Sequence, residues 1–159
     1  MRTNQAETTT PAPGRPDRRR ENLARGNLAA VILLLIEYGL GMGVNLYVSL
    51  PAAGNGGRDI GKAFTSGPAL AVHAVIGLLL ILMAISMIVR AAMARHRASV
   101  VTSAVGFLAI LAAAGYGASF VHDSTNAASY GMALATGVAL LSYAIGLFLT
   151  RRPAAPETA

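Results

Sequence analysis

Residues 68–89 read PALAVHAVIGLLLILMAISMIV, an apolar run that holds one histidine and no charged side chain. A helix of roughly 20 apolar residues crosses a hydrocarbon layer about 30 Å thick, because each residue adds about 1.5 Å. A helix on the surface of a soluble protein would instead carry polar residues along one face. The run therefore predicts a transmembrane helix.

Three further runs have the same apolar character, at residues 28–50, 99–121 and 127–150. In lipid, backbone groups must be paired inside their own segment, which a helix achieves. Strands of a membrane barrel would alternate apolar and polar residues, and these runs do not. Short connections make successive helices antiparallel neighbours. The sequence thus predicts an all-α membrane protein, an up-down four-helix transmembrane bundle over residues 27–151.

The two ends of the chain differ sharply from the bundle. Residues 1–26 and 152–159 contain mainly Thr, Pro, Ala, Arg and Glu, with very few large apolar side chains. Such segments bury too little surface to offset the entropy lost on ordering. We therefore expect disordered N- and C-terminal tails.

Composition excludes several kinds of function. The chain has 159 residues, of which 54% are hydrophobic and 13% charged, and this is the size of one domain. It contains no cysteine, which excludes disulfides, thiolate metal sites and cysteine nucleophiles. The net charge of +6 does not indicate nucleic-acid binding, because the charges flank the apolar runs. In that position they set orientation and contact anionic lipid head groups, so the expected partner is the lipid bilayer.

The basic residues also predict the orientation in the membrane. Eleven arginines fall on one side of the predicted bundle: Arg2, Arg15, Arg18, Arg19, Arg20, Arg25, Arg90, Arg95, Arg97, Arg151 and Arg152. The other side has only Arg58 and Lys62. Because Lys and Arg accumulate in cytoplasmic loops, both termini should be cytoplasmic. The expected location is the plasma (inner) membrane of a bacterium, with multiple passes.

Glu37 is the most unusual residue of the first run, because it should lie about 13 Å deep, near the bilayer centre. An acid at that depth suggests a proton-relay or ligand-contact residue, or a protonated residue that fixes helix packing. Glu37, Gly41 and Asn45 form one stripe that should face the interior. At the same depth the fourth run offers Ser142 and Tyr143 as partners for Glu37.

His73 should lie level with Asn45 and Tyr116, so these side chains form a predicted polar layer inside the bundle. His73 and His122 come from neighbouring antiparallel helices at similar heights, and a haem held by both is an alternative hypothesis. His122, however, stands at the mouth of the bundle beside polar residues. No cofactor is predicted, and haem remains the alternative.

The strings EYGLGMGVNLYVSLP, GPALAVHAVIGLLLIL and GYGASFV resemble those of small four-transmembrane-helix bacterial membrane proteins of unknown function. The resemblance covers about residues 28–150 and implies the four-helix fold but no activity. Members of that group have an Asn-containing acidic stretch where this chain has VHDSTN, so His122 departs from their pattern. One half of haem A synthase is also similar in its helix number, but its fuller set of histidines is missing here.

No catalytic signature appears in the chain. The predicted role is a structural or accessory membrane subunit that associates with itself as a homo-oligomer or with a larger membrane complex. Two alternatives use particular residues: a haem-binding or redox protein based on His73, with His122, and a small proton-coupled transporter based on Glu37. Four short helices would have to dimerise to enclose a transport pathway.

The orientation can be tested by cysteine labelling, since the chain has no cysteine of its own. Cysteines introduced at Gly56 and Ser124 should react with an impermeant thiol reagent in intact cells, and one at Ala94 should not. Labelling at Ala94 alone would reverse the predicted orientation.

Overall fold

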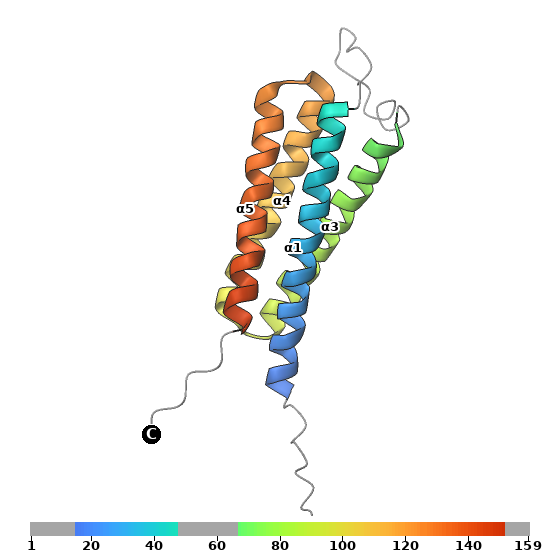
Figure 1. Cartoon of the computed structure of the whole chain (residues 1–159). Helices are drawn as coiled ribbons and strands as arrows, with labels where there is room; N and C mark the ends of the chain where they lie inside the picture. The colour runs from blue at the N-terminus through green and yellow to red at the C-terminus, as the bar shows by residue number, and fades with distance from the viewer. Residues whose placement is uncertain (1–14, 48–66, 152–159) are drawn as a thin grey trace, which may run out of the picture.

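The computed structural model describes residues 15–47 and 67–151, which form four α-helices (Figure 1). They are α1 (Arg15–Tyr47), α3 (Pro68–Met93), α4 (Arg97–Asp123) and α5 (Asn126–Arg151). The chain direction alternates from each helix to the next, and within the described ranges there is no strand. The predicted all-α four-helix class is confirmed.

Each helix is long and apolar enough to cross a membrane. The apolar segments cover 30 residues of α1 and 26 residues of each other helix. Large apolar side chains cover the outer surface of the bundle, among them Ile32, Leu82, Leu108 and Leu141, each at least half exposed. A soluble bundle would place polar residues there. The described residues therefore form a multi-pass membrane bundle with lipid-facing side chains.

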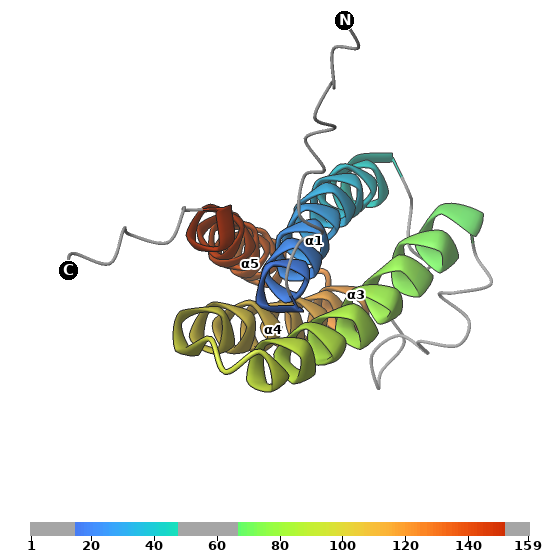
Figure 2. The same ribbon diagram turned by 90° about the horizontal axis from the view of Figure 1, so that it is seen from below.

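The four helices form a closed ring, which Figure 2 shows from one end. α1 packs on α3 and α5, and α4 also packs on α3 and α5. The two diagonal pairs, α1 with α4 and α3 with α5, have no close backbone approach in the described part of the chain. Each helix therefore needs one inward stripe, shared between two neighbours.

The inward stripes repeat every three and four residues in alternation. In α1 the stripe begins at Leu23, and in α3 it begins at Leu70. Listed in order, the inward positions are Leu23, Asn27, Ala30, Leu34, Glu37, Gly41 and Val44 in α1, and Leu70, His73, Gly77, Leu80, Ala84, Met87 and Ala91 in α3. This spacing averages 3.5 residues and is typical of helices that pack with side chains inserted between those of a neighbour.

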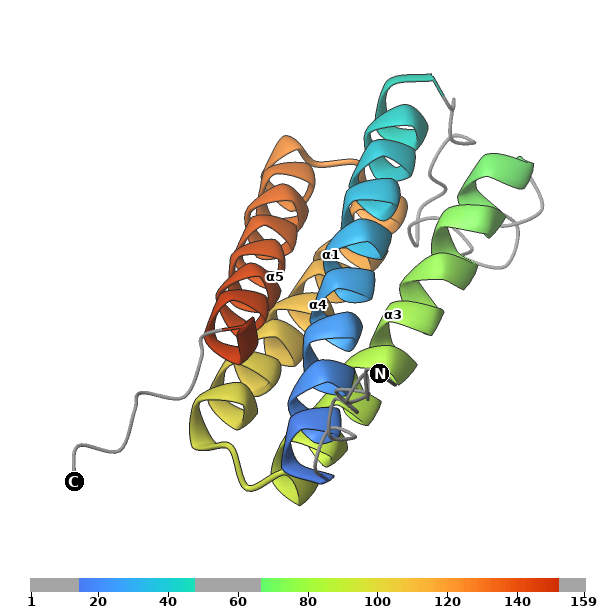
Figure 3. The same ribbon diagram turned by 60° about the horizontal axis from the view of Figure 1, so that its bottom comes forward.

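Packing is densest in the half of the bundle that contains the α3–α4 turn. We call this the basic end, because Arg18, Arg19, Arg20, Arg25, Arg90, Arg95, Arg97 and Arg151 all belong to it. Its core joins α1, α3 and α5 through Leu23, Met87 and Tyr143, each at most 2% exposed. Towards the other end, α3 leans away from the other helices (Figure 3).

The start of α1 corrects one expectation from the sequence. Residues 15–26 were expected to belong to a disordered tail, but α1 is helical from Arg15. Leu23 is buried, and Arg19 donates a hydrogen bond of 2.9 Å from Nη1 to the Met93 carbonyl oxygen, which is an open acceptor at the end of α3. Arg25 and Glu21 add an ion pair of 2.6 Å one helical turn apart. Residues 1–14 and 152–159 lie outside the described residues.

Two tight turns join the last three helices. Arg95 has a positive φ of 54° between α3 and α4, and the ring of His96 accepts a hydrogen bond of 3.2 Å from the Ser99 amide, which caps α4. Ser124 ends α4 with a φ of 52° and donates its amide to the Phe120 carbonyl. His96, in the turn between α3 and α4, thus caps the start of α4.

A glycine of α4 offers a test of the packing at the basic end. A Cβ at Gly106 would lie 2.7 Å from a ring carbon of Tyr143, which is only 1% exposed and has little room to move. Gly106→Ala should lower the free energy of unfolding by about 1–3 kcal/mol, as overpacking usually does. The measurement is thermal melting in detergent, with Gly115→Ala on the same helix as the control. A Cβ at Gly115 meets no atom within 4 Å, so an equal effect of both substitutions would contradict this packing.

Candidate functional site

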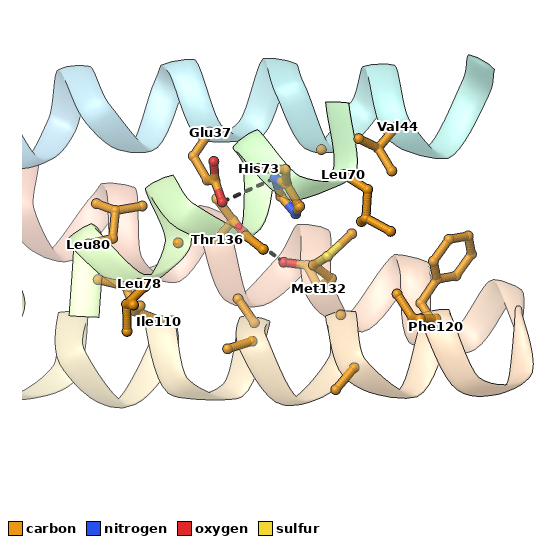
Figure 4. A pocket seen from close by; sticks show the side chains of 18 of the residues that line it. Glu37, Val44, Leu70, His73, Leu78, Leu80, Ile110, Phe120, Met132 and Thr136 are labelled. Carbon is orange, nitrogen blue, oxygen red and sulfur yellow. Dashed lines mark hydrogen bonds and ion pairs between the residues drawn. The ribbon is translucent and has the colours of Figure 1, made fainter. Parts of the chain in front are cut away.

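A cavity of about 300 Å³ lies among the four helices in the half away from the basic end (Figure 4). It is bounded by the last part of α1, the first part of α3, the last part of α4 and the first part of α5. Most of the lining is apolar, and its larger side chains include Leu70, Leu80, Ile110, Phe120 and Met132. Glu37, His73, Asn45 and Thr136 supply its polar atoms.

The cavity exists because small residues occupy inward positions at this level. Gly41 of α1 and Gly77 of α3 belong to the inward stripes described above. α4 adds Ala113, Gly117 and Ala118 from the sequence LAAAGYGA, residues 111–118. Side chains of this size leave the space between the diverging helices unfilled, whereas Leu, Met and Tyr fill it at the basic end.

Glu37 and His73 form the central feature of the cavity. His73 Nδ1 lies 3.0 Å from Glu37 Oε1, across the α1–α3 interface. The side chain of Glu37 is 12% exposed and that of His73 is 21% exposed. The ring nitrogen is close to the carboxyl oxygen but is not aligned with it as in a hydrogen bond. The contact is therefore a close polar pair in which a small rotation of either side chain would change the bonding.

Each member of the pair packs against a glycine of the other helix. A Cβ at Gly41 would lie 3.0 Å from His73 Cε1, and a Cβ at Gly77 would lie 3.2 Å from Glu37 Oε1. Glycine follows the polar residue by four positions on both helices, and the helices run in opposite directions. The α1–α3 pair thus has a reciprocal arrangement, in which each helix provides one polar side chain and the space for the other. Close approach at small residues is the usual way in which helices associate in lipid.

Two buried polar atoms of the site have no hydrogen-bond partner within the described residues, His73 Nδ1, which contacts Glu37 Oε1, and the second carboxyl oxygen of Glu37. Glu37 Oε2 is buried and has no hydrogen-bond partner within the described residues. Thr136 does not supply one, because its hydroxyl donates to the Met132 carbonyl at 2.9 Å. A buried polar atom without a partner costs about 1–3 kcal/mol, so this oxygen favours an additional hydrogen-bond or ionic partner from the cavity.

Some polar residues singled out in the sequence lie elsewhere. Tyr116 does not line the cavity and is 45% exposed, because its ring packs over Gly131 between α4 and α5. Ser142 donates to the Val138 carbonyl at 2.8 Å, within its own helix. The Tyr143 ring packs against Gly106 in the core of the basic end. His73 therefore takes the place expected for Ser142 or Tyr143 as the partner of Glu37.

His73 and His122 differ in their surroundings. His73 lines the cavity, whereas His122 is exposed near the end of α4 and is not among the lining residues. Within residues 15–47 and 67–151, no group of three His, Cys, Asp or Glu side chains is placed to hold a metal ion. The cavity itself thus offers one histidine and one carboxylate.

Comparison of the chain with models of known families, with curated proteins and with solved structures finds no match. What the site can do therefore rests on its own geometry.

The cavity also reaches the surface that faces lipid. Three of its lining residues, Leu78, Ala114 and Ala118, are exposed, and Leu78 is exposed to 57%. They lie on α3 and α4, the neighbours whose separation grows towards this end. A molecule dissolved in the bilayer could enter between these helices without crossing water. An apolar space with one polar pair suits an amphipathic molecule of small size.

The reciprocal packing gives a prediction at Gly41. Gly41→Ala should displace the His73 ring, because the new methyl group would be too close to Cε1. We expect a lower melting temperature in detergent and a changed ¹⁵N NMR signal for His73, with the signals of His96 and His122 unchanged. Gly39→Ala is the matched control, since a Cβ at Gly39 meets nothing within 4 Å. An unchanged His73 signal in Gly41→Ala would contradict the arrangement.

Proposed function

We propose that this protein binds a small amphipathic molecule from the bilayer in the cavity among its four helices. The apolar body of the ligand occupies the space beside Leu80, Ile110 and Met132. Its polar group contacts the Glu37–His73 pair. The observation that carries the proposal is the buried, unpartnered Oε2 of Glu37 in an apolar cavity open towards lipid.

The placement of the pair supports binding over a purely structural role. A carboxylate that only fixed helix packing would gain most by having both oxygens satisfied in the interface. Here one oxygen contacts His73 and the other does not pair with protein. Gly41 and Gly77 leave room for the two side chains, and the rest of the cavity contains no side chain from the described part of the chain.

The proposed location is the plasma (inner) membrane with both termini in the cytoplasm. The first described residue and the end of α5 lie at the same end of the bundle, which is also the basic end. Arginines on one side of a membrane protein favour the cytoplasmic side. The cavity then belongs to the half of the bundle nearer the outer surface.

A cavity-filling substitution tests binding. Ala114→Leu places a larger side chain at the exposed edge of the cavity, where it opens between α3 and α4, while Ala112→Leu places the same side chain at an exposed position outside the lining. Native mass spectrometry of protein purified from membranes should detect a bound small molecule in wild type and Ala112→Leu. The bound fraction should fall at least tenfold in Ala114→Leu, with helix content by circular dichroism unchanged.

Two of the other roles derived from the sequence give different results in this preparation. A haem-binding protein would show a Soret band that His73→Ala removes. A subunit that acts only through other proteins would carry no small molecule, and Ala114→Leu would then leave the mass spectrum unchanged. Either outcome overturns the proposed function.

A further inference from the structure

The charge balance of the cavity restricts the ligand. Glu37 on α1 and His73 on α3 are the titratable side chains of the lining, and α4 and α5 contribute none among their described lining residues. An apolar environment disfavours a net charge. The pair is neutral when it holds one proton in total, either as carboxylate with imidazolium or as carboxylic acid with imidazole. Two protons leave the site positive, and none leaves it negative.

A bound cation changes which of these states is neutral. With one positive charge from a ligand beside Glu37, neutrality requires the carboxylate together with neutral imidazole. A pair that holds one proton must then release it from the site. A neutral ligand makes no such demand, and an anion would require an extra proton. The buried, unpartnered Oε2 of Glu37 is the atom that a cation would approach.

We infer that the ligand is a lipophilic monovalent cation that is bound in exchange for one proton. The inference rests on the proposed function, and it adds the charge of the ligand and the coupling to protons. Before binding, the site holds one proton and the cation is free. After binding, the site holds the cation and one H⁺ has been released, so charge and protons balance.

The described lining contains no arginine or lysine that would compete with such a ligand. Within the described ranges, the arginines gather at the basic end and the cavity lies towards the other. His73 is the one lining group that can carry positive charge, and it does so only while it holds the proton. The exchange therefore replaces the proton of the pair by a cationic ligand beside the Glu37 carboxylate.

The test uses two probes of nearly equal shape. Benzyltrimethylammonium is cationic, and neopentylbenzene has the same skeleton with carbon in place of nitrogen. Binding of each to the full chain in detergent is measured by calorimetry in buffers of different ionisation enthalpy, which counts the protons released. We expect at least tenfold tighter binding of the cation, with about one proton released for each cation bound.

Two variants complete the experiment. Glu37→Gln should bind both probes about equally and release no proton. Glu21→Gln, which removes an exposed carboxylate paired with Arg25, should behave like wild type. Equal binding of both probes by wild type would overturn the inference and leave the proposed function standing. Cation binding without proton release would also overturn it, and binding of neither probe would overturn both proposals.

Discussion

Lipid tails are as apolar as the side chains of these helices, so the hydrophobic effect does not drive the helices together. The bundle depends instead on close side-chain packing along one inward stripe per helix. The stripe repeats every 3.5 residues, and in α1 it runs without interruption from Leu23 to Val44. The same stripe that packs the core at the basic end contains Glu37 and Gly41 further along. The site is therefore a continuation of the core in which large side chains are replaced by small and polar ones.

Much of the fold could be predicted from the sequence, because each apolar run is long enough to cross a membrane and is apolar along nearly its whole length. Glu37, Gly41 and Asn45 were expected on one inward face, and all three line the cavity. The helical start of α1 was missed, since the composition of residues 15–26 resembles that of a disordered tail. The signal was present in the spacing of Leu23, Asn27, Ala30 and Leu34, which continues the inward stripe beyond the apolar run.

The partner of Glu37 could not be predicted from depth alone. Depth places Ser142 and Tyr143 level with Glu37 but says nothing of rotation about the helix axis or of which helices are neighbours at that height. The Ser142 hydroxyl donates its hydrogen bond within α5, and the Tyr143 ring packs on Gly106. The decisive feature is a relation between two helices: glycine follows Glu37 on α1 and His73 on α3 by four positions. Read separately, each of these glycines indicates only close packing.

The ring of helices closes between α1 and α5, the first and the last to be synthesised. Asn27 of α1 is buried against Gly146 of α5 and beside Thr102 of α4, and its Oδ1 would touch a Cβ at position 146. This side of Asn27 is therefore covered only when α5, the last helix of the chain, packs against α1. The contact of Glu37 with His73 needs only α3, the next helix of the chain. The polar pair can therefore form before the bundle closes, whereas Asn27 is covered only by the closed bundle.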